Sequence, residues 1–101
     1  MLQIEDIRAC CNNDNIFLTD HLLTRMRQRQ IRLEDIKNAI EEGEIIEQYP
    51  TDYPFPSCLI NSEKIHVVCS INERYLYIIT AYRPSLEQWE AGGRKRKGSR
   101  Q

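Results

Sequence analysis

The hydrophobic periodicity of the chain changes once, at Gly43, and this change limits the possible folds more than any other feature. Before Gly43, apolar residues such as Ile4, Ile7 and Cys11 recur every three to four positions, the spacing of an amphipathic helix. After Gly43, short runs of β-branched and aromatic residues with a period of two favour strands. Helices followed by strands along the chain predict an α+β fold.

Three helices are expected in the first part of the chain, over residues 3–11, about 20–29 and about 33–42. Either Thr19 or Asp20 can cap the second helix at its N-terminus. The buried stripe of that helix is expected to contain Leu22, Leu23 and Met26. Gly43 follows the third helix, where a left-handed C-cap favours glycine.

Four strands are expected after Gly43, over residues 44–49, 57–61, 65–71 and 75–82. The later connections are short enough for hairpins, whereas 50–56 is a loop with three prolines. These elements predict N-terminal helices packed on one face of a four-stranded, mostly antiparallel sheet. Residues 1–90 are expected to form one domain that ends in a helical turn over 85–89. Residues 91–101 are expected to form a basic, flexible tail.

Composition indicates a globular protein, with 41% hydrophobic and 29% charged residues. Because no run of about 18 apolar residues and no secretory signal is found, we expect a cytoplasmic protein with no membrane contact. The cysteines at positions 10, 11, 58 and 69 form no Cys-x-x-Cys pair. We therefore expect buried or free thiols, with no metal site and no cofactor.

Charge is distributed unevenly along the chain. Residues 91–101 carry a formal charge of +5, from basic residues that include Arg94, Lys95 and Arg96, whereas residues 1–90 carry −6. The tail is either a solvated chain end or a segment that contacts phosphates, and the sequence favours neither reading. Any other surface for nucleic acid must be a local patch.

His21, Arg25 and Arg29 are spaced four residues apart in the second expected helix. Each step of four rotates the position by about 40°, so the three side chains share one face. Such a row of cations can bind an anion. The alternative is a solvent-facing row whose arginines pair with strand carboxylates such as Glu44 or Glu47.

His66 and the segment Tyr82-Arg83-Pro84 are the other candidates for chemistry. Strand alternation places His66, Val68 and Ser70 on one face, and the pKa of histidine suits a general acid or base. Pro84 ends the last strand, where Tyr82 and Arg83 can stack a base or clamp a phosphate. A structural role for His66 is the alternative, and Trp89 is expected to fold back into the core.

A series of segments resembles a known family over about residues 16–90. They are Leu18-Thr19-Asp20-His21, Arg25-Met26, Arg29-Gln30-Ile31, Glu34-Asp35-Ile36, Gly43 to Pro50, Ser57 to Ile60, His66-Val67-Val68 and Ile79 to Pro84. In order and spacing they resemble a domain-of-unknown-function family of small bacterial proteins. That family is related to the RelE/MqsR-type ribonuclease toxins of the barnase–EndoU–colicin–RelE fold, whose members often pair with YgiT-type zinc-finger antitoxins.

The resemblance implies the toxin of a type II toxin–antitoxin system, a metal-independent endoribonuclease (mRNA interferase). Such enzymes direct the 2′-hydroxyl of RNA onto the adjacent phosphate, which needs a base, an acid and cations. Carried over to this chain, the resemblance makes His66 and His21 the acid and base. It makes Arg25, Arg29 and Arg83 the phosphate clamps, while Tyr82 donates a proton or stacks a base and Thr80 bonds the substrate.

Two alternatives remain open at this stage. The acidic balance of residues 1–90 favours a non-catalytic module that binds RNA or protein, because RNA-cleaving enzymes are usually basic. A ribosome-dependent nuclease, inert on free RNA, is the other alternative. A toxin also needs a cognate antitoxin, which is expected to dock either over the active cleft or along an open sheet edge.

Overall fold

A computed structural model describes residues 1–84, 89–90 and 95–96 of the chain. Its helices are α1 (Ile4–Asn12), α2 (Asp20–Arg29) and α3 (Leu33–Glu42). Its main strands are β1 (Ile16–Leu18), β2 (Glu44–Tyr49), β3 (Ser57–Asn61), β4 (His66–Asn72) and β5 (Tyr75–Tyr82). Two short strands, β6 (Trp89–Glu90) and β7 (Lys95–Arg96), pair antiparallel with each other. The three predicted helices and four predicted strands are confirmed.

The main sheet has five strands in the order β1-β5-β4-β3-β2. The expectation of four strands is wrong because it did not include β1. Neighbours are antiparallel except for β1, which runs parallel to β5 with Ile16 opposite Leu76. A strand of three residues is too short to show a period of two, and its partner lies far along the chain. The predicted helical turn over 85–89 lies mostly outside the described residues, but its last residue, Trp89, begins β6.

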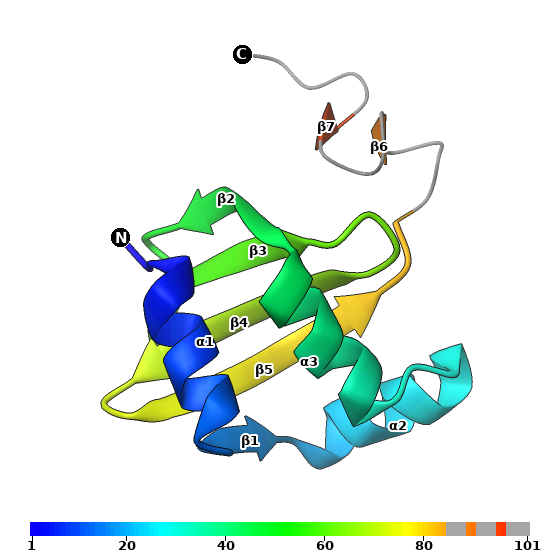
Figure 1. The fold of residues 1–101 in the computed structure, drawn as a ribbon, viewed down its shortest axis with the longest axis horizontal. Helices are drawn as coiled ribbons and strands as arrows, with labels where there is room; N and C mark the ends of the chain where they lie inside the picture. The colour runs from blue at the N-terminus through cyan, green and yellow to red at the C-terminus, as the bar shows by residue number, and fades with distance from the viewer. Residues whose placement is uncertain (85–88, 91–94, 97–101) are drawn as a thin grey trace.

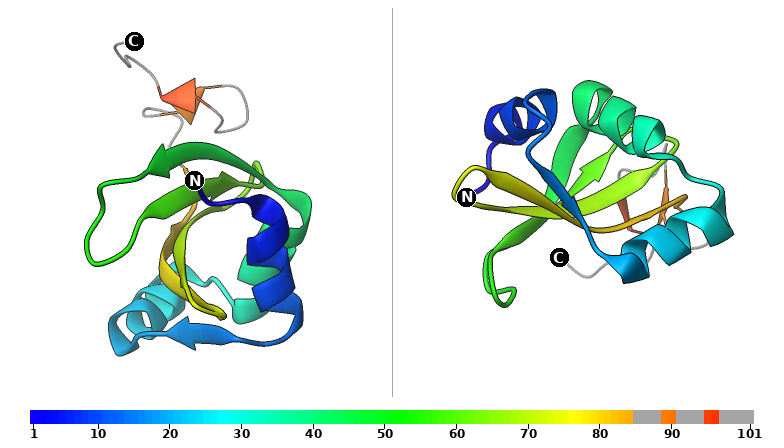
Figure 2. Two further views of the ribbon diagram at one scale, coloured as in Figure 1. Left: turned by 90° about the vertical axis from the view of Figure 1, so that its left-hand side faces the viewer. Right: turned by 90° about the horizontal axis from the view of Figure 1, so that it is seen from below.

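The helices occupy two positions against the sheet (Figure 1). Figure 2 shows a strongly twisted sheet, with α1 and α3 side by side on one face and α2 at the β1 edge, against β5. Ile7, Ile36 and Ile40 of the two covering helices are at most 1% exposed and pack on Val67 and Leu76 of the sheet. The face that α1 and α3 cover is called the core face, and the opposite side is called the open face.

The narrow contact of α2 corrects one prediction. Leu22 and Met26 are buried as expected, but Leu23 is 38% exposed. A helix at a sheet edge meets the rest of the protein along one line, so its apolar stripe is narrower than that of a helix lying over a face. Thr19 caps this helix, because its Oγ1 accepts a hydrogen bond of 3.0 Å from the N–H of Leu22.

Two β-bulges set the side-chain directions of the outer strands. In β5, Cys69 of β4 faces Ile78 and Val68 faces Thr80, so Ile79 is an extra residue. In β2, Ile45 faces Ile60 and Glu47 faces Leu59, so Ile46 is extra. An extra residue reverses the alternation beyond it. The residues after each bulge that would otherwise enter the core therefore lie on the open face.

Gly43 is in extended conformation (φ −89°, ψ −173°), so the expectation of a left-handed C-cap is wrong. The chain passes directly from α3 into β2 there, and the left-handed residue is instead Gln30 after α2 (φ 56°). Gly43 is required for a different reason. A Cβ on this residue would lie 2.5 Å from Ala39 O and 2.7 Å from Asn61 O.

Arg8 of α1 reinforces this crowded junction between α3 and β2. Its Nε donates to Ile40 O (3.0 Å) and its Nη2 to Gly43 O (2.9 Å). These carbonyls belong to the end of α3, where the intrahelical pattern stops and acceptors need other donors. α1 is thereby joined to α3 by hydrogen bonds as well as by apolar contact.

All four cysteines are buried free thiols, as the sequence predicts. Cys58 and Cys69 face each other on β3 and β4. A hydrogen bond between them lowers the pKa of Cys58 against the opposing effect of burial. The same hydrogen bond and burial both raise the pKa of Cys69, and burial raises the pKa of Cys10 and Cys11. In the described part of the chain, no helix has the length and apolar character needed to cross a membrane.

We predict that Gly43→Ala destabilises the protein by about 1–3 kcal/mol, the usual range for overpacking a closely packed site. Two of the atoms that the new methyl group meets are backbone oxygens, which cannot move without disturbing α3 or β3. Urea unfolding followed by circular dichroism measures the loss. Asn38→Ala, at an exposed position of α3, is the control, and an equal effect in both variants would contradict the explanation.

We also predict that dithionitrobenzoic acid labels no cysteine of the folded protein rapidly and labels four after denaturation. Cys58 and Cys69 are 0% exposed, and Cys10 and Cys11 are 9% and 7% exposed, so the reagent lacks access. Absorbance of the released thiolate counts the reacting groups. Rapid labelling of one or more thiols in the native state would show that the core opens readily.

Candidate functional site

Three polar side chains form a row across the open face. The strand register places Asn61 of β3 opposite His66 of β4, and His66 opposite Tyr82 of β5. Asn61 and His66 are 2% and 0% exposed, whereas Tyr82 is half-buried. Buried polar groups on a sheet face without a covering helix are a departure from the usual pattern of burial. This polar row is the first component of the candidate site.

His66 and Tyr82 are in direct contact. The Nδ1 of His66 lies 3.4 Å from the Tyr82 hydroxyl oxygen, and the rings meet edge to face with centroids 5.4 Å apart. At this distance the contact is a long hydrogen bond, in which either group can donate according to the histidine tautomer. Tyr82 is the more accessible of the two, so a molecule on the open face meets its hydroxyl before the imidazole.

Asn61 brings an unused hydrogen-bond donor to the row. Its Oδ1 accepts from the N–H of Glu63 at 2.9 Å, but its buried Nδ2 has no partner in the described structure. A buried donor without an acceptor costs about 1–3 kcal/mol, so such groups are few and often serve function. The sequence reasoning did not identify Asn61. The one sequence feature that pointed to Asn61 was its place as a polar residue at the end of an apolar strand, beside a hairpin. Polar residues with a purely structural role are common at such places.

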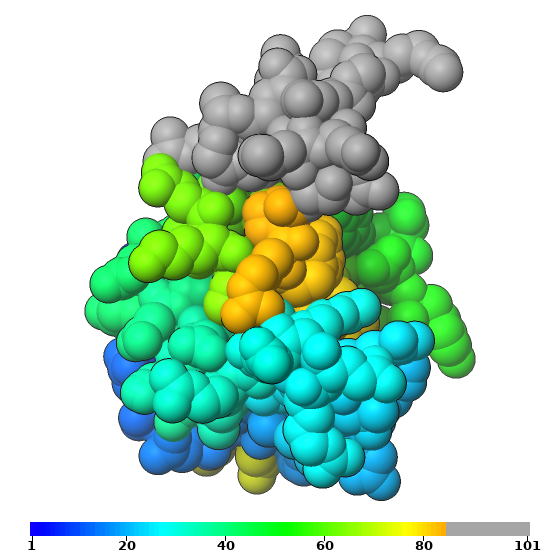
Figure 3. Space-filling model, turned by 90° about the vertical axis from the view of Figure 1, so that its right-hand side faces the viewer, coloured from blue at the N-terminus to red at the C-terminus, as the bar shows by residue number. Residues whose placement is uncertain are grey.

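The end of β5 lies against α2 (Figure 3), and Arg83 and Arg29 connect the two elements by hydrogen bonds. Arg83 donates from Nη1 to Arg29 O and from Nη2 to Gln30 O. Arg29 donates from Nη1 to Ala81 O (2.9 Å) and to Thr80 Oγ1 (3.3 Å). Cations on the last carbonyls of a helix stabilise its C-terminus, so both arginines help to hold α2 on the sheet. Thr80 is thereby connected to Arg29.

These arginines have no acidic partner among residues 1–84. The ion pairs found there are Arg32 with Asp35 and Lys37 with Asp14. Arg25 contacts Gln28 (3.4 Å). The alternative expectation that the α2 arginines pair with Glu44 or Glu47 is therefore wrong. Arg25, Arg29 and Arg83 are called the arginine cluster below, and none of them forms an ion pair within the described residues.

The structure does not unite all the predicted residues. His21 is exposed at the start of α2 and forms no hydrogen bond or ring contact with His66 in the part of the chain that is described. Arg25 is exposed, whereas Arg29 turns inward to β5. Arg94 lies outside the described residues, and Lys95 and Arg96 are described only as strand β7. The site thus contains His66, Tyr82, Thr80, Arg29 and Arg83, with Arg25 nearby on α2.

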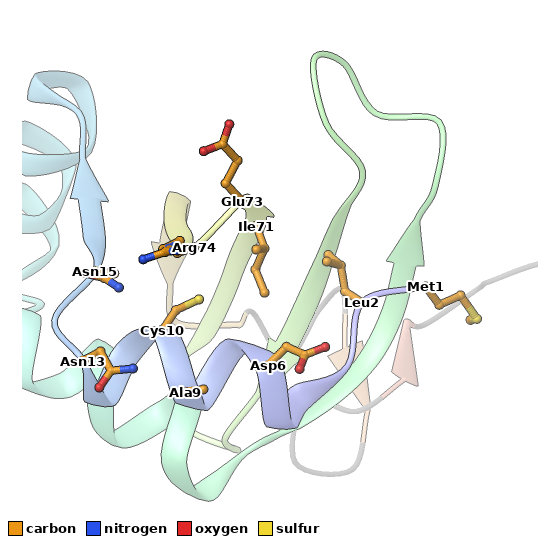
Figure 4. A pocket seen from close by; sticks show the side chains of 10 residues that line it. All are labelled: Met1, Leu2, Asp6, Ala9, Cys10, Asn13, Asn15, Ile71, Glu73 and Arg74. Atoms are coloured by element: carbon orange, nitrogen blue, oxygen red, sulfur yellow. The ribbon is translucent and has the colours of Figure 1, made fainter.

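A concavity elsewhere does not share these features. It measures about 530 Å³ and lies between α1 and the β4–β5 turn, where Figure 4 shows Asp6 and Cys10 of the helix with Glu73 and Arg74 of the turn. None of the predicted site residues lines it. Among the described residues, no group of three His, Cys, Asp or Glu side chains is arranged to hold a metal ion.

We predict that Arg29→Ala destabilises the protein by about 1–2 kcal/mol, because Ala81 O and Thr80 lose a charged donor. Arg25→Ala is the matched control on the same helix, and its expected change is within about 0.5 kcal/mol because its guanidinium contacts one exposed side chain. Thermal and urea unfolding measure both. Equal stability of the two variants would mean that Arg29 does not hold α2 in place.

A comparison of sequences identifies the family of the chain. Residues 18–83 match a family described as Domain of unknown function (DUF4258), and this range includes α2, α3, strands β2 to β5 and the polar row. No curated protein and no solved structure matches the chain significantly. Because the match covers well over half of the sequence, the chain belongs to the DUF4258 family.

Proposed function

We propose that this protein is a metal-independent endoribonuclease, the mRNA-cleaving toxin of a type II toxin–antitoxin system. The observation that carries the proposal is the arginine cluster, which forms no ion pair among the described residues, near the His66–Tyr82 contact on the open face of the sheet. Cations beside a group able to transfer a proton are what phosphodiester cleavage through the 2′-hydroxyl needs. The resemblance of the sequence to RelE/MqsR-type toxins supports the same chemistry.

The arginine cluster supplies the phosphate site in this proposal. Arg29 uses Nη1 for Thr80 and Ala81, so its Nε and Nη2 donors remain for a phosphate oxygen. Its half-buried position holds the guanidinium still, and a pre-positioned cation stabilises developing negative charge without reorganising. Residues 1–90 carry a net charge of −6 with the cluster included, so this local positive patch is where an anion binds best.

The His66–Tyr82 contact supplies proton transfer. In the proposed step, the Tyr82 hydroxyl accepts the proton of the 2′-hydroxyl and passes its own to His66 Nδ1 across the 3.4 Å contact. The 2′-oxygen forms its bond to phosphorus as the bond from phosphorus to the 5′-oxygen breaks, and water protonates the leaving oxygen. The products are a 2′,3′-cyclic phosphate and a 5′-hydroxyl end.

A non-catalytic RNA-binding module is the second candidate, and the burial of His66 favours it. A histidine that is 0% exposed reaches substrate only through Tyr82, and 3.4 Å is long for an effective proton transfer. In this reading the same cluster binds phosphate, and the polar row only stabilises the sheet. Cleavage of RNA is the property that distinguishes the two candidates.

An antitoxin is the protein partner that the proposal requires, and by resemblance it is a YgiT-type zinc-finger protein. β2 is an edge strand of six residues in the five-stranded sheet. An edge presents unpaired backbone groups to which a partner can add a strand. Contact with the arginine cluster would instead block the phosphate site directly.

We predict that the full chain cleaves single-stranded RNA in the presence of EDTA, and that Tyr82→Phe lowers the rate by about 10²- to 10⁴-fold, the usual contribution of general acid–base catalysis. His66→Gln is expected to lower it similarly. Gel analysis of end-labelled RNA, free and ribosome-bound, measures the rate and detects the cyclic phosphate. Thr24→Val, which also removes a hydroxyl group but at an exposed position of α2, is the control and should keep the wild-type rate.

Three results would contradict the nuclease proposal. One is cleavage by Tyr82→Phe at the wild-type rate, and another is cleavage of RNA that carries a 2′-deoxyribose at the scissile position. The third is salt-dependent RNA binding without cleavage of either RNA form, which supports the binding module. In that case Arg29→Lys should weaken binding more than Arg27→Lys, since Arg27 is exposed on the other side of α2.

A further inference from the structure

An aromatic cleft lies on the open face, at the opposite end of the strands from the polar row. Phe17 of β1, Tyr77 of β5, and Tyr53 and Phe55 of the β2–β3 loop form its walls, around a volume of about 440 Å³. The register places Tyr77 between Phe17 and Ser70. This volume is within the usual range for small-ligand sites.

The rings in the cleft are arranged in layers. Phe17 stacks on Tyr77 with centroids 5.0 Å apart and planes 14° from parallel. Phe55 lies on Tyr77 with a wider separation of 6.4 Å and an angle of 27°. Near-parallel rings offer flat π-faces, which suit a planar aromatic ligand better than an aliphatic one.

The apolar surface of this region is exposed. Phe17 and Ile79 are each 46% exposed, Tyr53 is 95% exposed, and Tyr75, which contacts Phe17, is 41% exposed. These four are most of the large hydrophobic side chains that are exposed among residues 1–84. Apolar groups gathered in one place cost solvation free energy and usually mark a binding site.

The polar lining identifies the kind of ligand. Among the described residues, Asp52 is the one charged residue that lines the cleft, and one of its oxygens accepts a hydrogen bond from Ser57. Its carboxylate repels phosphate but accepts hydrogen bonds from amino groups. Cytosine and adenine carry such an amino group at their pairing edge, whereas uracil has a carbonyl oxygen there.

The cleft lies on the same face of the sheet as the proposed phosphate site. Ser70 lines the cleft, and His66 lies four residues earlier on the same face of β4. Four residues of strand span about 13 Å, so one single strand of RNA can reach both places. Resting on the proposed function, we infer that the cleft binds an unpaired nucleobase with an exocyclic amino group, at a neighbouring nucleotide of the RNA strand.

Binding of RNA that resists cleavage tests this inference without relying on catalysis. The probes are fluorescent hexacytidylate and hexauridylate with 2′-O-methyl riboses, measured by anisotropy with the full chain at low salt. We expect tighter binding of the cytidylate. Tyr77→Leu and Phe17→Leu should each weaken its binding about 10-fold, since stacking on an aromatic ring typically contributes about that much per base.

Asp52→Asn tests the selectivity for amino groups. This variant keeps an acceptor for Ser57 but loses the charge, so the preference for cytidylate over uridylate should fall to near one. Leu23→Ala, an exposed apolar position on α2, is the control and should bind both probes as the wild type does. A structural role for Asp52 would weaken both probes equally and would overturn the assignment of the base edge.

The possible outcomes separate this inference from the nuclease proposal. Tyr77-dependent binding without cleavage of unmodified RNA supports the cleft and contradicts catalysis. Cleavage with binding that Tyr77→Leu and Phe17→Leu leave unchanged overturns the cleft and leaves catalysis standing. Absence of binding to both probes, or equal binding of a duplex with both strands paired, also overturns the inference.

Discussion

The β-bulge at Ile79 determines which residues can act together in this protein. Leu76 and Ile78 point into the core, and an uninterrupted alternation would place Thr80 and Tyr82 there as well. The extra residue reverses the alternation, so that Ala81 enters the core and Tyr82 lies opposite His66 on the open face. Without the bulge, the hydroxyl of Tyr82 would be buried under the helices, and neither the polar row nor the link from Arg29 to Thr80 would exist.

The bulge in β2 has the same effect at the other side of the sheet. Ile45 packs against the core, and beyond Ile46 the acidic Glu47 lies on the open face while Gln48 turns back to bond with Leu2. The two bulges therefore produce one face that is almost entirely apolar and another that is mixed. The core face is stabilised by burial of aliphatic side chains. The open face holds the buried polar groups, which the protein retains despite their cost in solvation.

The sequence predicted the elements well and the relations between them poorly. Residues in a long periodic segment, such as His66, Val68 and Ser70 of β4, were placed on the correct face because their neighbours repeat the pattern. β1 was missed because its pairing with β5 is parallel and distant in sequence. The bulges were also missed, since an extra residue is defined by the partner strand and has no signal of its own.

The candidate site was therefore predictable in part. His66, Tyr82 and Arg83 stood out by residue type at strand ends, but the grouping of Arg83 with Arg29 depends on how α2 docks at the sheet edge. Asn61 became a candidate only when its unpaired amide was seen. His21 shares a helix face with Arg25 in sequence, yet no contact in the described structure connects it to His66. Spacing along one element is readable from sequence, whereas contact between elements requires the register.

The two ends of the open face differ in charge. The arginine cluster at the end of β5 attracts phosphate. At the other end of the strands, Asp52 repels phosphate, so the stacked rings of Phe17 and Tyr77 are suited to binding an uncharged base. The remaining acidic surface of residues 1–90 disfavours other positions for an anionic strand. In the proposed mode of binding, RNA therefore lies along the strands with its reacting phosphate beside Tyr82. The selectivity for a base and the chemistry at the phosphate then belong to opposite ends of β5, which is why the two can be tested by separate substitutions.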